Sequence, residues 1–421
     1  MPGRPEPGAP PSRAAALANG ALAKAWAAGA LPRPKLDARA FEKRALRGAP
    51  GETLGPDTGW REPFERLVAA LRDEADLNPL GLTMAHGQIV QALRARIRAH
   101  RLWRAHPEIL ARPIAAPVII LGTMRSGTTR LHRLLACDPR FAHTRLFESL
   151  IPVPLSGPRD SRILRARFGL AALRRFNPAL AAIHPMSPFD AEEEFGLFSF
   201  SFGSPQFEAQ WRVPGFVGWW EAADPAWLYR EFRALLQTIA WSRGDSPKAT
   251  WLLKAPQFMQ DLPAILEAFP DARLICLDRD LDAVVASSAS LVWHQMRIQS
   301  DRADQRWIGR EWLRKTLLRR QVADAARRDH PGVPQIDIGY QAMERDWRGE
   351  IHRIYTFLDL PLPAAVEARM SRYLGAATSH RGHRYSLEQF GLSPNAVRGL
   401  GLTLYAHLAA GIQIAASASP M

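Results

Sequence analysis

The chain of 421 residues is long enough to bury a large core, and its length fits two or three domains or one enlarged domain. Apolar residues make up 47% and charged residues 23%, which is typical of a soluble globular protein. The net charge of +14 comes almost entirely from arginine, because the sequence has only six lysines. This bias, beside so much alanine and proline, indicates a GC-rich genome more than a polyanion site, so we expect no nucleic-acid partner.

The cysteines and the N-terminal sequence bear on the cellular compartment. We expect Cys137 and Cys276 to be reduced and structural, since the sequence has neither a disulfide framework nor a C-x-x-C metal pair. The first residues, MPGRPEPGAPPSR, contain no apolar run of signal-peptide length. The least polar stretch, residues 399–419, is weakly hydrophobic and predicts a packed terminal helix rather than a membrane span. These features predict a cytoplasmic protein.

The predicted elements divide the chain into regions. Residues 1–35, rich in proline, alanine and glycine, predict a flexible arm, and residues 36–112 predict a helical region with apolar residues at helical spacing. Over residues 113–405, the strand-like runs PVIIL, TWLLKAP, ARLICLDRD and QIDIGY alternate with helical stretches. This alternation predicts a three-layer α/β fold with a central parallel sheet. The aromatic-rich segment 151–248 is a long insertion, and residues 406–421 form a C-terminal tail.

The first strand runs into a glycine-containing turn and a helix, PVIILGTMRSGTTRLHRLL. The turn has the glycine spacing of a Walker loop, G-x-x-x-x-G-K-[ST], but Thr128 follows Gly127 where the lysine should stand, and the cation has moved to Arg125. Backbone N–H groups from Ser126 to Thr129 would converge at the start of the helix, where the helix dipole favours an anion. The turn therefore predicts a phosphate site without the lysine and magnesium of an NTPase.

The run R-S-G-T-T resembles the 5′-phosphosulfate loop of the sulfotransferases that use 3′-phosphoadenosine 5′-phosphosulfate (PAPS), although Met124 stands where proline is usual. The resemblance covers residues 115 to about 405 and points to bacterial members, which are related to the protein-tyrosine and cytosolic aryl sulfotransferases. It implies a P-loop NTPase-like sulfotransferase domain over 113–405, with the insertion 151–248 as acceptor pocket and lid. It also implies transfer of a sulfuryl group from PAPS to a hydroxyl or amine, with adenosine 3′,5′-bisphosphate as product and no metal required. The residues that would hold the 5′-phosphosulfate are Arg125, Ser126, Gly127, Thr128 and Thr129.

A second nucleotide motif follows in ARLICLDRDLDAVVASSASL. Arg279 ends the strand and Ser287 lies in the next helix, and the resemblance implies that both bind the 3′-phosphate of the donor. Family members often have H-R-D-P where this chain has Asp278 to Leu281, so two aspartates flank the arginine.

The C-terminal third contains weaker donor candidates. Tyr340, in the strand-helix stretch IDIGYQAMERDW, is a candidate contact of the adenosine. His383 and Arg384 lie in a basic segment that resembles a loop closing over the donor in bacterial members. A solvated basic loop is an equally good interpretation of these two residues.

Two further residues complete the expected catalytic set with Arg125. Lys254 ends the strand WLLK and resembles the family lysine that contacts the transferring sulfuryl group, where a fixed cation stabilises developing charge. The histidine base of the cytosolic enzymes is absent, because Pro256 stands at its position. Glu148 resembles the glutamate of protein-tyrosine sulfotransferases and many bacterial relatives, so we predict it as the base. His184 and the run Glu192–Glu194 remain alternatives.

The acceptor is less defined. Aromatic rings in the insertion would suit an apolar pocket for a small-molecule, lipid-like or glycan hydroxyl acceptor, although such rings more often form plain core. The stretch RILRARFGLAALRRF would suit an anionic membrane face or a polyanionic glycan, with an ordinary exposed amphipathic helix as the default. The oligomeric state is not determined. The aromatic residues are Phe195, Phe198, Phe200, Phe202, Phe207, Trp211, Phe216, Trp219, Trp220, Trp227 and Trp241.

Two other functions compete with sulfuryl transfer. A P-loop kinase or NTPase is disfavoured because no Walker lysine follows Gly127. A nucleotide-binding protein that kept the fold and lost the chemistry stays open, because Asp278 and Leu281 depart from the family pattern.

Overall fold

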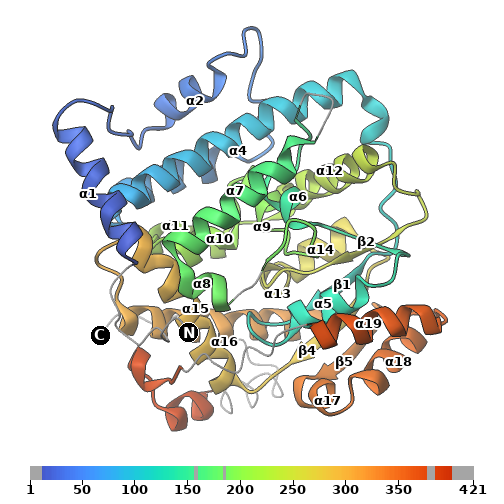
Figure 1. The fold of residues 1–421 in the computed structure, drawn as a ribbon. Coiled ribbons are helices and arrows are strands. Elements are labelled where there is room, and N and C mark those ends of the chain that lie inside the picture. The colour runs from blue at the N-terminus through green and yellow to red at the C-terminus, as the bar shows by residue number, and fades with distance from the viewer. Residues whose placement is uncertain (1–11, 156–159, 184–185, 377–384, 401–421) are drawn as a thin grey trace.

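The computed structural model describes residues 12–155, 160–183, 186–376 and 385–400 (Figure 1). Several predictions concern residues outside this part of the chain. They are the alternative base His184, the loop candidates His383 and Arg384, the C-terminal tail and nearly all of the predicted terminal helix.

A five-stranded parallel sheet in the order β2-β3-β1-β4-β5 forms the centre of the fold. Ile119 in β1 lies opposite Leu253 in β3 and Leu274 in β4. Because the strands are parallel, their carboxyl ends meet at one edge of the sheet. All four strands predicted from the sequence are present, and the three-residue β2 was too short to show a pattern. The strands are β1 Val118–Leu121, β2 Phe141–His143, β3 Thr250–Leu253, β4 Arg273–Asp278 and β5 Gln335–Gly339.

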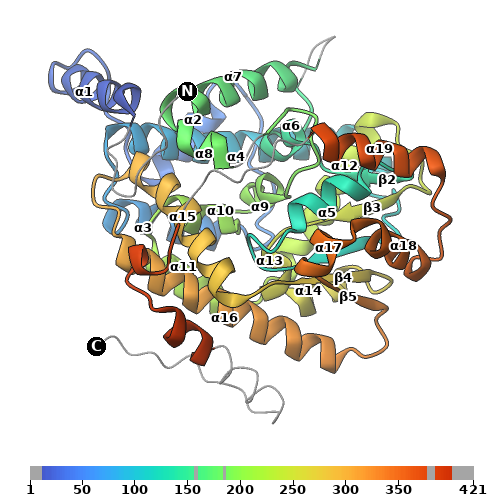
Figure 2. The same ribbon diagram turned by 60° about the horizontal axis from the view of Figure 1, so that its bottom comes forward.

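The two faces of the sheet belong to different hydrophobic cores. Val118 and Ile120 of β1 pack with α5, α17, α18 and α19, whereas Ile119 and Leu121 pack into a second core on the other face. The predicted three-layer α/β class with a central parallel sheet is confirmed. The helices over the first face, close together in Figures 1 and 2, are α5 Thr128–Leu135, α17 Tyr340–Arg345, α18 Trp347–Phe357 and α19 Ala364–Ala376.

The remaining helices lie before β1, between β2 and β3, and between β3 and β5, and most of them contribute buried side chains to the second core. Those before β1 are α1 Arg13–Ala27, α2 Ala38–Leu46, α3 Arg61–Asp73 and α4 Pro79–Ala105. Those between β2 and β3 are α6 Leu146–Leu150, α7 Ser161–Phe176, α8 Pro178–Ile183, α9 Phe195–Phe200, α10 Pro205–Gln210, α11 Pro214–Ala222 and α12 Ala226–Arg243. Those between β3 and β5 are α13 Gln257–Gln260, α14 Leu262–Ala268, α15 Leu281–Gln299 and α16 Gln305–Asp329.

The start of the chain differs from the flexible arm that its composition predicted. Helix α1 begins after Ser12, whose hydroxyl oxygen accepts the Ala15 N–H at 3.2 Å and donates to the Phe176 carbonyl at 2.8 Å. Ala15 is buried in a small apolar cluster with residues of α4 and α15. The prediction gave weight to the flanking prolines, whereas the run RAAALANGALAKAWA is rich in alanine, the best helix former, and has a good N-cap.

Most aromatic rings of the segment 151–248 contribute to the second core rather than to an open pocket. Phe198 stacks on Phe232 with ring centroids 5.0 Å apart. Trp60 and Phe64 of the N-terminal region belong to the same core, so this region packs as part of the main body. Of the eleven singled-out aromatic residues, those that are buried are Phe198, Phe200, Phe202, Phe207, Trp211, Phe216 and Trp220.

A buried ion pair joins α4 to α12 inside this core. The guanidinium of Arg96, 0% exposed, donates two hydrogen bonds to the Glu231 carboxylate at 2.7 and 2.8 Å. Its charge also faces the rings of Trp60 and Phe200, at 4.4 and 4.6 Å from their centroids. Burial alone would raise the pKa of Glu231, but the hydrogen bonds and charge of Arg96 together with the hydroxyls of Ser201 and Thr58 hold the pKa below its usual range.

Glu231→Ala is expected to lower the free energy of unfolding by about 3–5 kcal/mol, because it leaves Arg96 as an uncompensated buried charge. Urea unfolding followed by tryptophan fluorescence measures this loss. The double variant Arg96→Met/Glu231→Leu should recover much of it, since both charges are removed. Equal destabilisation in the single and double variants would show that the ion pair is not the cause.

Candidate active site

The loop between β1 and α5 has the shape of an anion cradle. The Ser126 N–H and hydroxyl both donate to the Thr123 carbonyl, at 3.1 and 2.7 Å, which closes a tight turn. Gly127 has φ +97° and its missing Cβ would lie 2.9 Å from the Tyr340 ring, so glycine is required there. Thr128 then begins α5, and its N-terminal N–H groups have no helical acceptor.

The predicted donor residues of three separate elements meet beside this loop. Arg125, in a left-handed conformation with φ +70°, donates from Nε to the Ser287 hydroxyl of α15 at 3.0 Å. Arg279, directly after β4, donates from Nη1 to the Arg125 carbonyl at 2.8 Å. The Arg125 side chain is mostly buried, and burial lowers its pKa, as expected for a cation that lacks a carboxylate contact. Two cations and a hydroxyl therefore converge at the carboxyl edge of β1 and β4.

The aspartates that flank Arg279 have partners of their own. Asp278 pairs with Arg320 of α16 at 2.9 Å, and Asp280 accepts a hydrogen bond from Gln341 at 2.8 Å. The guanidinium of Arg279 instead lies 4.0 Å from the centroid of the Tyr340 ring. Tyr340, the adenosine candidate, thus packs against both Gly127 and Arg279.

Lys254 reaches the other side of the loop from the end of β3. Its ammonium donates to the Thr129 hydroxyl at 3.0 Å and pairs with the Glu193 carboxylate. The side chain is only 1% exposed, so these contacts surround a buried cation. The short loop from Arg125 to Thr129 therefore has one cation at each end: the Arg125 side chain at its start and Lys254 at Thr129.

The carboxylates of the run Glu192–Glu194 have three different environments. Glu192 pairs with Arg133 of α5 at 3.4 Å. Glu193 pairs with the Lys254 ammonium and keeps 13% of its side chain exposed. Glu194 is fully buried and accepts the backbone N–H of Lys254 at 3.1 Å. Consecutive residues, Glu193 and Glu194, therefore hold Lys254 at its side chain and at its backbone.

Glu148, the predicted base, has other hydrogen-bond partners than this cluster. Both of its carboxylate oxygens are hydrogen-bonded to Arg243 at the end of α12, and one of them also accepts the Arg145 N–H at 2.9 Å. The residue is 0% exposed, and among the described residues neither Lys254 nor Thr129 is one of its hydrogen-bond partners. This geometry is that of a structural ion pair. Arg243 lies 95 positions away in the chain, so no local pattern could indicate this pair.

His132 is a buried residue of the site region that sequence reasoning missed. It lies one turn after Thr129 on α5, fully buried, and neither ring nitrogen has a hydrogen-bond partner among the described residues. Burial lowers its pKa well below the usual value, and the charge of Lys254 adds to the effect. A neutral imidazole therefore lies close to Lys254. In the sequence, only the position of His132 on the inner face of the helix could have indicated that it is buried.

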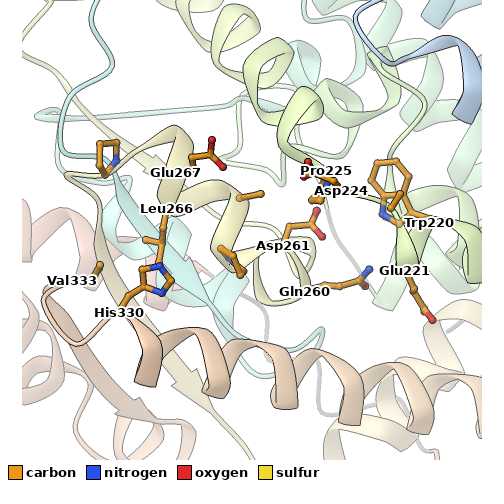
Figure 3. Close-up of a pocket in the computed structure, with 14 residues that line it drawn as sticks. Trp220, Glu221, Asp224, Pro225, Gln260, Asp261, Leu266, Glu267, His330 and Val333 are labelled. Atoms are coloured by element: carbon orange, nitrogen blue, oxygen red, sulfur yellow. The ribbon is translucent and has the colours of Figure 1, made fainter. Parts of the chain in front are cut away.

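A cavity of about 540 Å³ lies elsewhere, between the α11–α12 junction, α14 and the segment before β5 (Figure 3). Trp220, Asp261 and His330 are among the residues that line it. Burial raises the pKa of Asp261 to about 6. Neither Lys254 nor Arg279 lines this cavity, so it is separate from the phosphate loop.

The architecture and the loop define a class of enzyme, and the comparisons agree with it. The sequence model of the sulfotransferase family matches residues 117–364, well over half of the chain, and the chain belongs to this family. The protein is an enzyme that transfers sulfuryl groups on a P-loop NTPase-like α/β fold, and these predictions are confirmed.

Individual relatives are mycobacterial. The chain is 25% identical over 294 residues, 64% of its length and 70% of theirs, to the omega-hydroxy-beta-dihydromenaquinone-9 sulfotransferases Stf3 of Mycobacterium tuberculosis and Mycobacterium bovis. The crystal structure of STF1 from M. tuberculosis matches with TM-score 0.75 and 26% identity, over 86% of this chain and 97% of that one. STF9 from Mycobacterium avium shares the fold, with TM-score 0.75 and 23% identity over 90% and 97% of the two chains.

The environment of Glu194 leads to a prediction about stability and pH. Burial raises the pKa of Glu194 well above its usual value, and the hydrogen bond from the Lys254 N–H offsets only part of this effect. Above the pKa of the unfolded chain the folded state then binds more protons, so wild-type stability falls as pH rises toward the folded pKa. Glu194→Gln cannot ionise and keeps an acceptor for the Lys254 N–H.

We expect the stability of Glu194→Gln relative to wild type to increase between about pH 5 and pH 8, by at most about 1.4 kcal/mol per pH unit. Urea unfolding of both proteins across this range measures the difference. Glu192→Gln, at a neighbouring carboxylate paired with Arg133, is the control. Parallel pH curves for wild type and Glu194→Gln would contradict a neutral buried Glu194.

Proposed function

We propose that this sulfotransferase takes PAPS as donor at the β1–α5 loop. The observation that carries the proposal is the convergence of Arg125, Arg279 and Ser287 from three elements on one side of the loop, with Lys254 on the other. Arg125 and the N–H groups of Ser126 to Thr129 bind the 5′-phosphosulfate. Arg279 and Ser287 bind the 3′-phosphate, which distinguishes this donor from ATP.

The proposed transfer is in line. The acceptor oxygen attacks sulfur, the bond from sulfur to the bridging phosphate oxygen breaks, and adenosine 3′,5′-bisphosphate leaves with that electron pair. Charge grows on the bridging and sulfuryl oxygens, and the Lys254 ammonium, held by Thr129, stabilises it. Sulfuryl transfer, like phosphoryl transfer, depends mainly on position and electrostatics, and the proposal requires no metal.

For the base we propose Glu193 in place of Glu148. Glu193 is the partly exposed carboxylate beside Lys254, so it can approach both the acceptor and the sulfuryl group. Glu148 is buried and engaged by Arg243 through both oxygens. Donor binding would offer Lys254 a second anion, which weakens its hold on Glu193 and leaves that carboxylate to accept the acceptor's proton.

The acceptor we propose is a hydroxyl on an apolar, lipid-like molecule. The name of the Stf3 relatives states a hydroxylated menaquinone as their acceptor, and that is the support from similarity. Within this chain, exposed apolar side chains occur on the segments next to Glu193: Phe189, four residues before it, is 50% exposed, and Leu150, which follows the Ser149 that donates to the Glu193 carbonyl, is 42% exposed. We keep residues 113–405 as the sulfotransferase domain. The described residues from α6 to Glu194 are the part of the domain that borders the acceptor.

Calorimetric titration with adenosine 3′,5′-bisphosphate, with and without magnesium, tests the donor site. We expect binding without magnesium, and Arg279→Ala should weaken it by about 10- to 100-fold, because it removes a charge-assisted contact to phosphate. Arg310→Gln, an exposed arginine of α16, is the control. Absence of binding at high micromolar ligand would refute the donor assignment, and a requirement for magnesium with turnover of ATP would favour an NTPase.

Radiolabelled PAPS with a short prenol as acceptor tests the base. Glu193→Gln is expected to lower kcat by about 10²- to 10⁴-fold, while adenosine 3′,5′-bisphosphate binding is kept or strengthened, since Lys254 loses a competing carboxylate. Glu148→Gln should lower stability more than kcat, because it breaks the pair with Arg243. Loss of kcat in Glu148→Gln with full activity in Glu193→Gln would reverse the assignment.

A further inference from the structure

Helix α7 presents an apolar ridge to solvent. At 3.6 residues per turn, Ala166 and Leu170 face the protein, and Arg162 is buried on the same side. Leu164 and Phe168 lie on the opposite side, and they are 54% and 67% exposed. α7 crosses the front of Figure 1 and the upper edge of Figure 2, so the helix lies at the surface in both views. Large apolar side chains projecting this far from a helix are typical of an interaction surface.

Arginines line both sides of the ridge. Arg167 and Arg174 follow one flank, Arg165 lies on the other, and Arg175 continues the outer face; all four are exposed. The sequence of α7 contains no acidic residue, and none of these four arginines makes an ion pair with any other described residue. The face therefore combines exposed apolar side chains with uncompensated positive charge.

The neighbouring surface of α4 adds to this charge. Arg98 lies among Arg165 and Arg162 of α7 and Arg94 and Arg101 of its own helix, and its Nε atom is buried without a hydrogen-bond partner in the described part of the chain. Burial first, and then the charges of these four arginines, lower the pKa of Arg98 to about 10. Arg162, the inner member of this group, is paired with Asp160 at 2.6 Å, and the cluster adds positive charge beside the exposed face of α7.

We propose that the α7 face, consisting of the exposed side chains of α7 and the adjoining arginines of α4, docks the protein on an anionic lipid bilayer. Leu164 and Phe168 enter the interface between headgroups and acyl chains, and the arginines on both flanks reach the lipid phosphates. A polyanionic glycan or nucleic acid would need the charges but would leave the apolar ridge in water. Within the described residues, no helix is long and apolar enough to cross a membrane, so the contact is one of lying on the surface.

Packing connects this face to the proposed active site. On its inner side, Arg162 of α7 donates to the Ile151 carbonyl at 3.2 Å and lies over the Phe147 ring. Phe147 in turn contacts the ring of Phe189, and the Ser149 hydroxyl of the same helix, α6, donates to the Glu193 carbonyl at 2.6 Å. The docked face thus borders the segment that holds the proposed base. Delivery of a lipid-like acceptor from the membrane rests on the proposed function, whereas docking itself does not.

Sedimentation of the full-length protein with vesicles tests the docking face. The vesicles are phosphatidylcholine alone and phosphatidylcholine with about one-third phosphatidylglycerol. We expect binding to the anionic vesicles only. Arg165→Gln/Arg167→Gln should weaken it by about 30-fold, about fivefold for each arginine, and Phe168→Ser should weaken it without changing the net charge.

The matched controls are Arg310→Gln/Arg328→Gln, which remove two exposed arginines of α16, and Leu110→Ser, at an exposed leucine outside α7. Equal losses in the α7 variants and these controls, or absence of vesicle binding, would overturn the proposal. Heparin binding that competes with vesicles and is insensitive to Phe168→Ser would overturn it in favour of a polyanion site. Calorimetry with adenosine 3′,5′-bisphosphate on the same variants measures the donor site separately. Failure of the docking proposal can therefore be distinguished from failure of the proposed function.

Discussion

One buried cation organises the active region of this enzyme. Lys254 is almost without solvent contact, and a charge in that position is tolerated only if polar groups surround it. The chain meets this requirement with Thr129 from the phosphate loop and Glu193 from the segment before α9, while Glu194 accepts the Lys254 backbone N–H. The same contacts fix the β1–α5 loop, the end of β3 and the proposed base relative to one another. The need to stabilise one ammonium therefore also assembles the groups that sulfuryl transfer requires.

The arginine excess has a structural explanation in two parts. Inside the protein, arginines compensate buried or flanking carboxylates: Arg96 pairs with Glu231, Arg243 binds Glu148 and Arg320 pairs with Asp278. The pair of Arg320 with Asp278 concerns the position at which this chain departs from the family pattern. It gives the aspartate next to Arg279 a partner of its own. The four exposed arginines of α7, which are Arg165, Arg167, Arg174 and Arg175, have no such partner among the described residues. The overall charge of +14 is thus unevenly distributed over the molecule.

Local motifs were predictable because short-range geometry determines them. A strand, a turn with glycine at position 127 and a helix beginning at Thr128 form an anion cradle wherever they occur, and the loop has this form. The spacing of Arg279 and Ser287 also led to side chains that meet at Arg125. The α1 helix was missed because composition was weighed above an alanine-rich run with a serine cap. From the sequence, the aromatic rings of the insertion could form either the hydrophobic core or an acceptor pocket. Burial of most of these rings favours the core.

By itself, the sequence determined the class of fold, the phosphate loop and the cations that surround it, since strand alternation and turn chemistry are local properties. Tertiary structure alone decided which carboxylate serves which cation. From the sequence, Glu148 is the predicted base and Glu193 one of the alternatives, but Glu148 lies beside an arginine 95 positions away and Glu193 beside a lysine 61 positions away. Tertiary structure also decided that the arginines of α4 and α7 form one face. Coulomb interactions act through space, so their partners are fixed only when packing brings distant segments together.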